Sequence, residues 1–456
     1  MRNGDVSFWH TGLGAPAPRA QLRNPRQADV AIVGAGFTGL WTAYYLKKCD
    51  PTLEVVVLEA RFAGYGASGR NGGWVSNAIT GGKARYAASH SPAAAEAFQR
   101  AMNDSVDQVI AFGGADGTGI GAVKGGELSV ATNAAQLGRL RAEYADEARW
   151  QSTDVRWLDA DETRARVNVH GVRGGMWHPH CARINPGKLV RALAAEVDRL
   201  GVPIYENTPV RRIRPRQAIT DAGTVEAQYI VRATEGFTAG LKGSHRDWLP
   251  MNSSMIATEP LPPDLWNEIG WEGRETLGDA AHAYMYAQRT ADDRIAFGGR
   301  GKPYLYGSRT DVDGHTPQAT IDMLAGLLHR FFPAAADVPI AHAWSGVLGV
   351  PRDWAATVGL ERRTGLGWAG GYVGTGVTAT NLAGRTLRDL ILGRDTEIAG
   401  LPWVDRRVRR WEIEPLRWVA VNALYSAYYR ADKAEEMGST RTSRFARVAD
   451  RVSGKA

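Results

Sequence analysis

The feature that most constrains the fold is a glycine-rich turn that follows an apolar run. Residues 29–33 predict a buried strand, and residues 40–48 predict a helix. A second apolar run, residues 55–58, ends at Glu59, which follows the last glycine of the turn by 20 residues. The glycines between strand and helix have the spacing G-x-G-x-x-G: Gly34, Gly36 and Gly39. This order of strand, glycines, helix, strand and acid predicts a βαβ unit that binds a dinucleotide.

Each residue type has a physical role in such a unit. Gly34 permits the tight turn, Gly36 lets a pyrophosphate approach the backbone, and Gly39 lets the helix pack close to the strand. The N–H groups at the helix start, with the helix dipole, attract the phosphates. Glu59 is expected to accept hydrogen bonds from the ribose hydroxyls, and its charge disfavours a 2′-phosphate, which argues against NADP.

A loop rich in glycine follows Glu59. Residues 60–74 lack hydrophobic periodicity and include the run Arg70-Asn71-Gly72-Gly73-Trp74. A mobile surface linker is one interpretation, because glycine and serine favour loops. We favour a ligand loop, because the segment begins at the ribose end of the motif and glycines let backbone lie flat against a planar ligand.

These segments resemble a known family, the D-amino-acid-oxidase superfamily of FAD-dependent oxidoreductases. The superfamily includes glycine, sarcosine and γ-glutamylputrescine oxidases, and the resemblance to the last is closest. It extends over about residues 28–395. The matching segments are residues 34–39, 57–59 and 66–73 near the start, residues 208–213 and 229–236 in the middle, and residues 366–380, which resemble the closing flavin loop.

The resemblance implies FAD as the cofactor. Family members with a covalent flavin use a late cysteine, whereas this chain has only Cys49 and Cys181, so we expect non-covalent FAD. A helix over residues 381–391 is expected to point its N-terminus at the flavin, where it would stabilise negative charge on the reduced ring. The expected FAD-binding residues are Gly34, Gly36, Phe37, Thr38, Gly39, Glu59, Ala60, Arg61, Gly66, Ala67, Ser68, Arg70, Asn71, Gly72, Gly73, Val210, Thr234, Gly374, Gly376, Val377 and Thr378.

The expected fold class is α/β plus α+β: a Rossmann-like FAD-binding domain with an inserted antiparallel, β-rich substrate domain. Short strand patterns between residues 250 and 345 indicate the second domain. A basic helical extension is expected over residues 401–456. The domain segments are 28–90, 184–240 and 341–398 for FAD binding, and 113–183 and 250–340 for the substrate.

The chemistry implied by the resemblance is hydride transfer to FAD from a carbon next to nitrogen. The substrate would be an amine or N-substituted amino acid, the imine product would hydrolyse, and O2 or another acceptor would take the electrons. An oxidase is favoured over a dehydrogenase, although Ala296 falls near the place of the family's oxygen-activating lysine, which leaves this choice open. The alternative is a flavin-binding accessory or regulatory subunit without turnover.

Aromatic residues of the β-rich segment are expected to face the flavin. Strand alternation puts Tyr284 and Tyr286 on one face, although ordinary core packing is the alternative for each residue. Trp74 is expected at the edge, and a guanidinium at a strand end suits a carboxylate anchor. The candidate catalytic residues are Tyr284, Tyr286, Trp344, His180 and Arg300.

Other classes of protein are disfavoured by the composition. Residues 178–181, His-Pro-His-Cys, lack a further clustered His or Cys partner, so we expect no metal site. The first residues lack the apolar core of a signal peptide, and no apolar run is long enough to cross a bilayer, so the cytoplasm is expected.

Residues 401–456 hold 12 Lys and Arg against 7 Asp and Glu. A membrane, nucleic acid or partner could attract such a helix, but we favour packing on its own domain with a solvated basic face, and no nucleic-acid binding. The sequence leaves the oligomeric state open.

Overall fold

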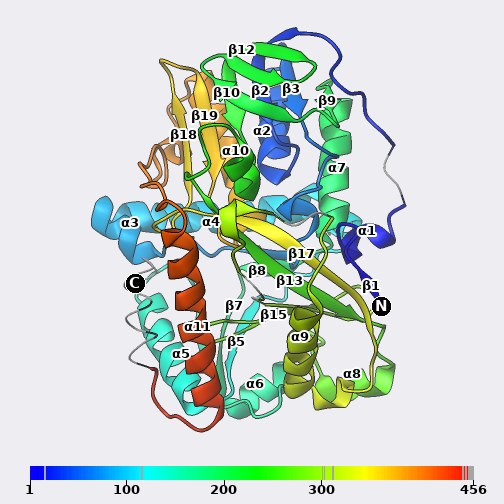
Figure 1. Cartoon of the computed structure of the whole chain (residues 1–456). Helices are drawn as coiled ribbons and strands as arrows, with labels where there is room; N and C mark the ends of the chain where they lie inside the picture. The colour runs from blue at the N-terminus through cyan, green and yellow to red at the C-terminus, as the bar shows by residue number, and fades with distance from the viewer. Residues whose placement is uncertain are drawn as a thin grey trace.

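The computed structural model describes residues 1–443 except 15, 16, 115, 116, 300, 302, 311 and 312, together with residues 446 and 449. Arg300, the expected carboxylate anchor, therefore lies outside the described residues. Two large sheets lie one above the other in Figure 1, with helices packed against both.

An eight-stranded sheet carries the expected βαβ unit, with β2, β3, β9, β12 and β19 paired in parallel and a β10–β11 hairpin at one edge. Alternate residues of β2 face opposite sides: Val30 and Ile32 pack under the helices, and Ala31 and Val33 face the other way. The strands are β10 (Val210–Arg214), β11 (Gln217–Thr220), β12 (Gly223–Arg232), β2 (Arg26–Val33), β3 (Val55–Leu58) and β9 (Ile204–Tyr205), with β19 (Leu366–Gly370) and β18 (Thr357–Glu361) joined through β12. The helices packed on it are α2 (Phe37–Cys49), α4 (Pro92–Phe112), α7 (Pro186–Arg199) and α10 (Gly376–Leu392).

A nine-stranded sheet forms the other half of the molecule. Its neighbours are antiparallel except for the parallel pairs β1–β17 and β14–β5, so it is mixed rather than purely antiparallel. In order, the strands are β1 (Arg2–Asn3), β17 (Ile340–Val350), β13 (Leu249–Thr258), β16 (Ile295–Gly299), β15 (Tyr286–Arg289), β14 (Thr276–Asp279), β5 (Glu127–Ala131), β7 (Gly174–His178) and β6 (Arg156–Leu158). The associated helices are α1 (Phe8–Thr11), α5 (Ala134–Glu147), α6 (Ala160–Arg166), α8 (Pro263–Ile269) and α9 (Gln318–Phe331).

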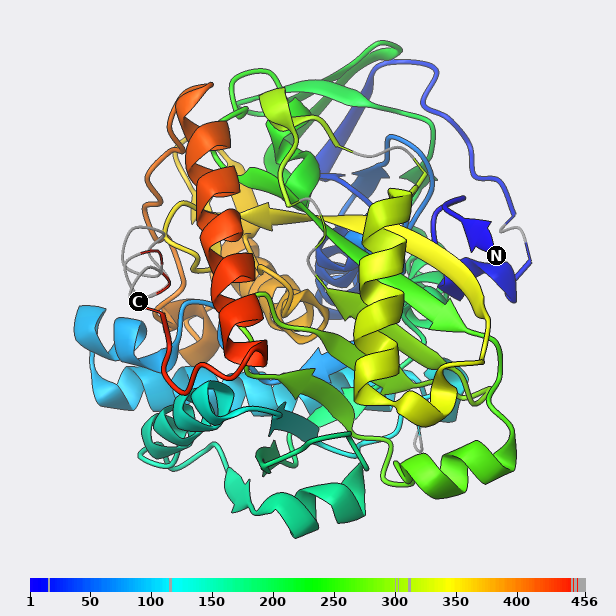
Figure 2. The ribbon, with the colours of Figure 1, turned by 60° about the horizontal axis from the view of Figure 1, so that its bottom comes forward.

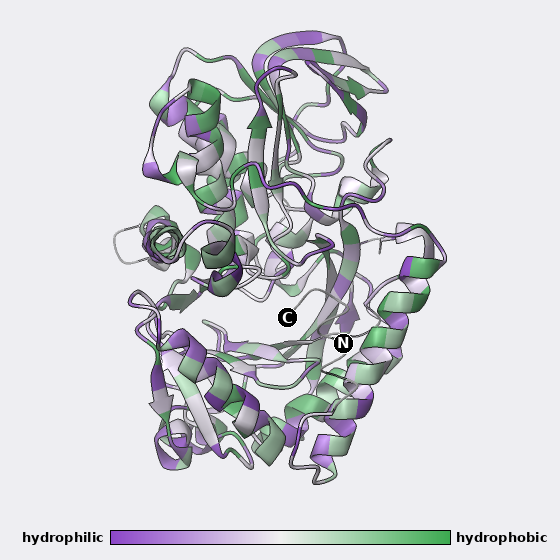
Figure 3. Ribbon diagram, turned by 90° about the vertical axis from the view of Figure 1, so that its left-hand side faces the viewer, coloured by the Kyte–Doolittle hydropathy of each residue, from purple (hydrophilic) through white to green (hydrophobic). Residues whose placement is uncertain are grey.

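Smaller elements join the two sheets. The ribbon of β4 (Trp74–Ser76) and β8 (Cys181–Arg183) is antiparallel and follows the glycine-rich loop, and α3 (Lys83–Ser89) comes next. The short 3-10 helices that bear on the site are η1 (Ala67–Gly69) and η3 (Glu235–Gly240). In Figure 3 many of the helices carry both green and purple segments, as expected for helices with one buried face.

Three expected boundaries are wrong. β17 belongs to the nine-stranded sheet, because it pairs along its length with β13, although we assigned residues 341–398 to the FAD-binding domain. The strand expected at residue 284 begins only at Tyr286, because the Asp279 carboxylate accepts a hydrogen bond from Met285 N and closes a turn before it. The helix expected to begin at Asn381 begins at Gly376.

The C-terminal helix α11 (Leu416–Glu436) packs on the protein, as we expected for the basic extension. Figure 2 shows it on the same side of the molecule as α9. Its inward face contributes Val421, Tyr425 and Tyr428 to a core cluster that includes Trp354. Among the described residues, no helix is both long enough and apolar enough to cross a membrane.

The βαβ unit depends on a close contact between α2 and the turn before it. A Cβ added to Gly39 would lie 2.0 Å from Gly34 O and 3.0 Å from Ile32 Cγ2. Gly34 has a φ of +108°, and a Cβ there would lie 2.6 Å from Ala233 O on the neighbouring segment. Gly34 therefore has the turn conformation expected of it, and Gly39 allows the close packing of helix and strand expected from the sequence.

Replacing Gly39 by alanine should lower the free energy of unfolding by about 1–3 kcal/mol, because backbone must move to admit the methyl group. The matched control is Gly138→Ala in α5, where an added Cβ meets no atom within 4 Å. That control should raise stability by up to about 1 kcal/mol through helix propensity. Urea unfolding of both variants measures the difference, and equal effects would exclude the contact as the cause.

Candidate functional site

A cavity of about 380 Å³ extends from the ends of β2 and β3 to β17 and the start of α10. Its lining is mostly apolar or glycine, with Glu59 and Glu235 among its few charged residues. The sequence-predicted residues that line it are Gly34, Gly36, Phe37, Thr38, Glu59, Ala60, Arg61, Gly66, Ala67, Ser68, Asn71, Val210, Thr234, Gly374, Gly376 and Val377. Segments more than 300 residues apart in the sequence thus meet around one elongated space.

Glu59 lies at one end of this cavity. Its Oε2 accepts a hydrogen bond from Ala35 N at 2.8 Å, and its Oε1 accepts one from Arg61 N at 2.9 Å. Burial raises the pKa of the carboxyl, while the hydrogen bonds from backbone N–H groups act in the opposite direction. Because an ionised carboxylate has about four acceptor positions, these backbone donors leave acceptor capacity for a ligand hydroxyl.

The N-terminus of α2 opens into the middle of the cavity. Gly36 caps the helix with extended backbone, and a Cβ there would lie 2.9 Å from Ser68 Oγ. Ser68 Oγ in turn accepts from Phe37 N at 2.7 Å, which ties the glycine-rich loop to the helix start. Narrow backbone space and the positive end of a helix dipole fit the pyrophosphate of a dinucleotide.

The closing loop reaches the cavity through Glu235, which our sequence prediction of the site omitted. Its carboxylate accepts from Gly371 N at 2.9 Å and from Tyr372 N at 3.1 Å. Burial raises the pKa of Glu235 to about 7, against the opposing effect of the backbone donors. The hydroxyl oxygens of Tyr372 and Thr38 are hydrogen-bonded at 3.1 Å, so the closing loop is also bonded to the start of α2, within the first glycine motif. Glu235 could have been predicted, because it is an acidic residue within residues 229–236, one of the segments that carry the family resemblance.

The remaining lining residues were not in our predicted set. They are mainly apolar, and some of them lie inside the segments that carry the family resemblance. They are Val33, Leu58, Tyr65, Ala233, Phe237, Gly240, Leu241, Val347, Leu348, Tyr372 and Thr380.

Five predicted cofactor residues are not among those that line the cavity: Gly39, Arg70, Gly72, Gly73 and Thr378. Arg70 is 2% exposed, its Nε donates to Tyr65 O at 2.7 Å, and its guanidinium lies 4.5 Å from the Tyr65 ring centroid. The side chain therefore holds the loop from inside. Gly73, with a φ of +72°, lies so close to Gln288 that an added Cβ would be 2.2 Å from the amide nitrogen.

Three aromatic residues lie at the edges of the two glycine loops, Trp74 and Tyr286 beside Gly72 and Tyr284 beside Gly374. A Cβ on Gly72 would lie 2.9 Å from Tyr286 Cδ2, and a Cβ on Gly374 would lie 3.9 Å from Tyr284 Oη. Tyr286 also contacts Trp74 edge-on, with ring centroids 6.3 Å apart. Tyr284 therefore lies near the closing loop although it precedes the strand in which we had expected it.

Glycines on the neighbouring strands make space for this aromatic group. Gly298 and Gly278 are both paired opposite Tyr286. A Cβ on Gly298 would lie 2.3 Å from the Tyr286 ring, and a Cβ on Gly278 would lie 3.4 Å from Trp74. Because these two strand positions lack side chains, the Tyr286 and Trp74 rings can lie close to the sheet backbone.

The positions of Trp344 and His180 do not support their predicted roles. Trp344 is fully buried beside Phe8 and Trp9, and its Nε1 donates to Arg70 O at 2.9 Å. It lies in the core because the N-terminal segment covers this part of the sheet. His180 instead pairs with Asp154, with 2.6 Å between Nε2 and Oδ2.

The His-Pro-His-Cys run does not converge on one point. His178 Nε2 lies 3.6 Å from a Glu127 carboxylate oxygen, whereas His180 pairs with Asp154. Cys181 is buried and lies within hydrogen-bond distance of Thr276, with 3.2 Å between Sγ and Oγ1. Their partners lie on different segments, so the run is not arranged as a set of ligands.

The N-terminal segment supports the glycine-rich loop from below, which the sequence did not predict. Ser7 Oγ donates to Gly69 O at 2.6 Å, and Trp9 Nε1 donates to Asn71 O at 2.7 Å. β1 extends the nine-stranded sheet just before this contact. The loop is therefore held by side chains that precede the βαβ unit in the chain.

Comparison with known proteins agrees with this geometry. The family model described as FAD dependent oxidoreductase matches residues 29–390. A probable oxidoreductase, OrdL, from Rhizobium meliloti is 29% identical over 393 residues, covering 82% of this chain and 85% of that protein. The γ-glutamylputrescine oxidoreductase of Escherichia coli is 27% identical over 413 residues, covering 88% and 93%.

Solved structures share the fold. Glycine oxidase from Geobacillus kaustophilus matches with a TM-score of 0.67 and 22% identity, covering 84% of this chain and 99% of that one. L-proline dehydrogenase from P. horikoshii matches with a TM-score of 0.67 and 18% identity, covering 82% and 95%. These likenesses confirm the expected fold class, a Rossmann-like FAD domain with a second, β-rich domain.

The fold and the cavity define a dinucleotide-dependent redox protein. The chain belongs to the family of DAO-type FAD-dependent oxidoreductases, and FAD is its cofactor.

The raised pKa of Glu235 predicts a pH-dependent difference between the wild type and Glu235→Gln. Below the unfolded value of 4.5 the folded and unfolded carboxyls are both protonated. Between 4.5 and about 7 the folded carboxyl keeps its proton while the unfolded one releases it, so rising pH destabilises the wild type. Urea unfolding of flavin-free protein should show this loss, at most about 1.4 kcal/mol per pH unit, relative to the variant. A pH-independent difference would contradict the assignment.

Proposed function

We propose that the protein oxidises the C–N bond of an amine or N-substituted amino acid. FAD, when bound, supplies a hydride acceptor for the carbon next to nitrogen, and the resulting substrate imine is hydrolysed by water. The two sheets have different roles in this proposal. The eight-stranded sheet and its loops bind the cofactor, and the nine-stranded sheet contributes the residues that face the substrate.

The observation that carries this proposal is the aromatic group at the edges of both glycine loops. Trp74, Tyr284 and Tyr286 lie next to Gly72 or Gly374, close to the cavity lining. An aromatic wall removes water from the substrate, and desolvation favours the neutral amine, which is the form that can give up a hydride. Aromatic faces also attract the ammonium form on its way in.

The names of similar proteins support the same substrate class. The relative from E. coli is a γ-glutamylputrescine oxidoreductase, and relatives from Rhodobacter capsulatus and Rhizobium meliloti are sarcosine oxidase β subunits. The structures with the same fold include glycine oxidase and L-proline dehydrogenase. Each of these names refers to an amine or amino acid.

We also propose that the flavin is held without a covalent bond and that O2 or another acceptor takes its electrons. Cys49 lies at the C-terminal end of α2, away from the helix start that faces the cavity. Cys181 is fully buried in β8. Neither cysteine lines the cavity, so neither is placed to form a thioether with its occupant.

The purified protein should be yellow and should release FAD on acid precipitation. Mixed anaerobically with γ-glutamylputrescine, putrescine, sarcosine or glycine, its flavin absorbance should bleach with at least one of them, and air should restore it. Absorbance spectra before and after denaturation and mixing provide the measurement. A flavin that dithionite bleaches but none of these amines reduces would favour the alternative, an accessory subunit without turnover.

If the substrate carries a carboxylate, Arg300→Ala should raise KM far more than it lowers kcat, because the guanidinium would bind ground state and transition state alike. Arg294→Ala is the control, because Arg294 precedes β16 and its side chain pairs with Asp292 and Glu259. Steady-state kinetics with the best carboxylate-bearing substrate measure both variants. Unchanged constants for Arg300→Ala would shift the assignment toward a simple amine or polyamine.

A further inference from the structure

Helix α11 follows the residues that the family model matches, which end at 390, and it packs beside the closing flavin loop. Its residues Val421 and Tyr425 belong to a cluster with Trp354, and partly buried Val373 packs against the same cluster. Val373 directly precedes Gly374 of the closing loop. One apolar cluster therefore joins part of α11 to the residue that precedes Gly374 in the closing loop.

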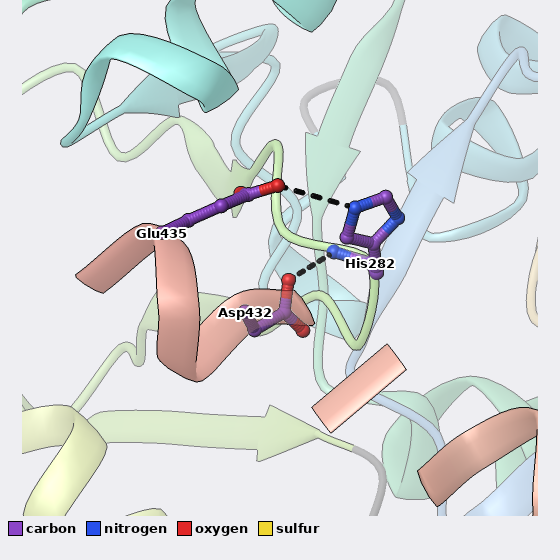
Figure 4. A group of neighbouring side chains, drawn as sticks. All are labelled: His282, Asp432 and Glu435. Atoms are coloured by element: carbon purple, nitrogen blue, oxygen red, sulfur yellow. Dashed lines mark hydrogen bonds and ion pairs between the residues drawn. The ribbon is translucent and has the colours of Figure 1, made fainter. Parts of the chain in front are cut away.

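Further along α11, Asp432 holds the loop of residues 280–285 between β14 and β15. Asp432 Oδ1 accepts from His282 N at 2.9 Å, and Oδ2 accepts from Ala283 N at 2.9 Å. Figure 4 shows the carboxylate directed at the loop backbone. Two successive N–H groups held by one carboxylate fix the path of the backbone immediately before Tyr284.

Glu435 and Arg139 hold the same loop from a second direction. Arg139 donates to both Glu435 carboxylate oxygens at 2.7 Å, and its Nε donates to Ala280 O at 2.9 Å. Glu435 is 2% exposed, so the carboxylate end of this forked ion pair is shielded from water. The His282 ring also stacks on Tyr428 of α11, with centroids 5.6 Å apart and planes at 2°.

The other end of the loop is fixed as well. Asp279 Oδ1 accepts from Met285 N at 2.9 Å. Tyr284 therefore lies between two backbone anchors, at residue 283 and residue 285. Its hydroxyl is directed at the Gly374 turn, 3.9 Å from where a Cβ of that glycine would lie. Tyr429 of α11 adds a hydrogen bond from its hydroxyl to Gly301 O, next in sequence to Arg300.

A metal ion is the competing explanation for this group. Ligand atoms of His282, Asp432 and Glu435 lie within 4.8 Å of one another. However, both Asp432 oxygens already accept backbone N–H groups, and the Glu435 charge is balanced by Arg139. Each carboxylate oxygen of the two acids therefore already accepts from a protein donor, which favours a clamp on the loop over a metal site.

We propose that α11 is a positioning element of the substrate site: through Asp432 and Glu435 it fixes residues 280–285 and so holds Tyr284 beside the flavin loop. The inference rests on the proposed function, because the part of Tyr284 in binding an amine is itself proposed. It assigns substrate selectivity in part to a helix outside the region matched by the family model.

Asp432→Asn tests the clamp in the FAD-loaded protein. The amide keeps one acceptor but presents an NH2 group to the other backbone N–H. KM for whichever of the four probe amines reduces the flavin should rise about tenfold, the size of one lost hydrogen bond to a charged group, with kcat and flavin content little changed. The control is Glu436→Gln, one turn along the same helix, whose carboxylate pairs with Arg330 rather than the loop. It should behave as wild type.

Two further measurements separate the clamp from a general structural role. In a Tyr284→Phe or Tyr284→Ala background, Asp432→Asn should have a smaller effect than in the wild type, because its effect on KM is proposed to act through Tyr284 and substitutions in one network are non-additive. An undiminished effect, or an unchanged KM in Asp432→Asn, would overturn the proposal. Arg139→Lys, which keeps the charge but loses the fork, should reproduce the KM increase if Asp432→Asn does not fold.

Hydrogen exchange distinguishes failure of the inference from failure of the proposed function. Backbone N–H groups of residues 280–285 should exchange faster in Asp432→Asn than in Glu436→Gln, whether or not any amine is oxidised. Equal protection in the two variants would exclude the clamp. EDTA should leave wild-type exchange and KM unchanged, and a loss that added Zn²⁺ restores would replace the clamp by a metal site.

Discussion

The relation between the two sheets depends on one buried carboxylate. Glu235 follows β12 of the eight-stranded sheet and accepts N–H groups from the closing loop. A Cβ added to Gly349 of β17 would lie 2.5 Å from the Glu235 carboxylate, and a Cβ added to Gly370 of β19 would lie 2.8 Å from it. Strands of both sheets therefore approach this group so closely that only glycine fits. The cavity takes its shape from that approach, since its wall includes residues of both sheets.

Sequence alone predicted the parts of the site in which neighbours in the chain are neighbours in space. The βαβ unit is such a case, because its glycines and Glu59 act through local turns and a helix end. Arg70 and Trp344 were predicted less well. Alternation along a strand tells which side chains share a face, but it does not tell what covers that face. Here the covering element is the segment around Trp9, more than 300 residues away from Trp344 in the chain.

Contacts with residues far away in the sequence also explain the boundary error at Tyr284. Residues 283–288 alternate as a strand should, yet the strand begins at Tyr286, because Asp279 and Asp432 both take backbone N–H groups from the preceding turn. One of these acids is about 150 residues distant, on a helix whose sequence indicated only amphipathic packing. Side-chain acceptors that compete for backbone donors over such distances leave no local signal.

The support of the glycine-rich loop by Ser7 and Trp9 has a consequence for how the protein folds. β1 pairs in parallel with β17, joining Arg2 to His342, and its edge of the sheet cannot exist until β17 has been synthesised. The entropy of closing so long a loop grows only logarithmically with length, but the contact must wait for its partner. The βαβ unit is complete within the first 60 residues. The contacts that Ser7 and Trp9 make with its glycine-rich loop should form later. Capture of the flavin should accordingly be one of the last events of folding, after the N-terminal segment has paired with β17.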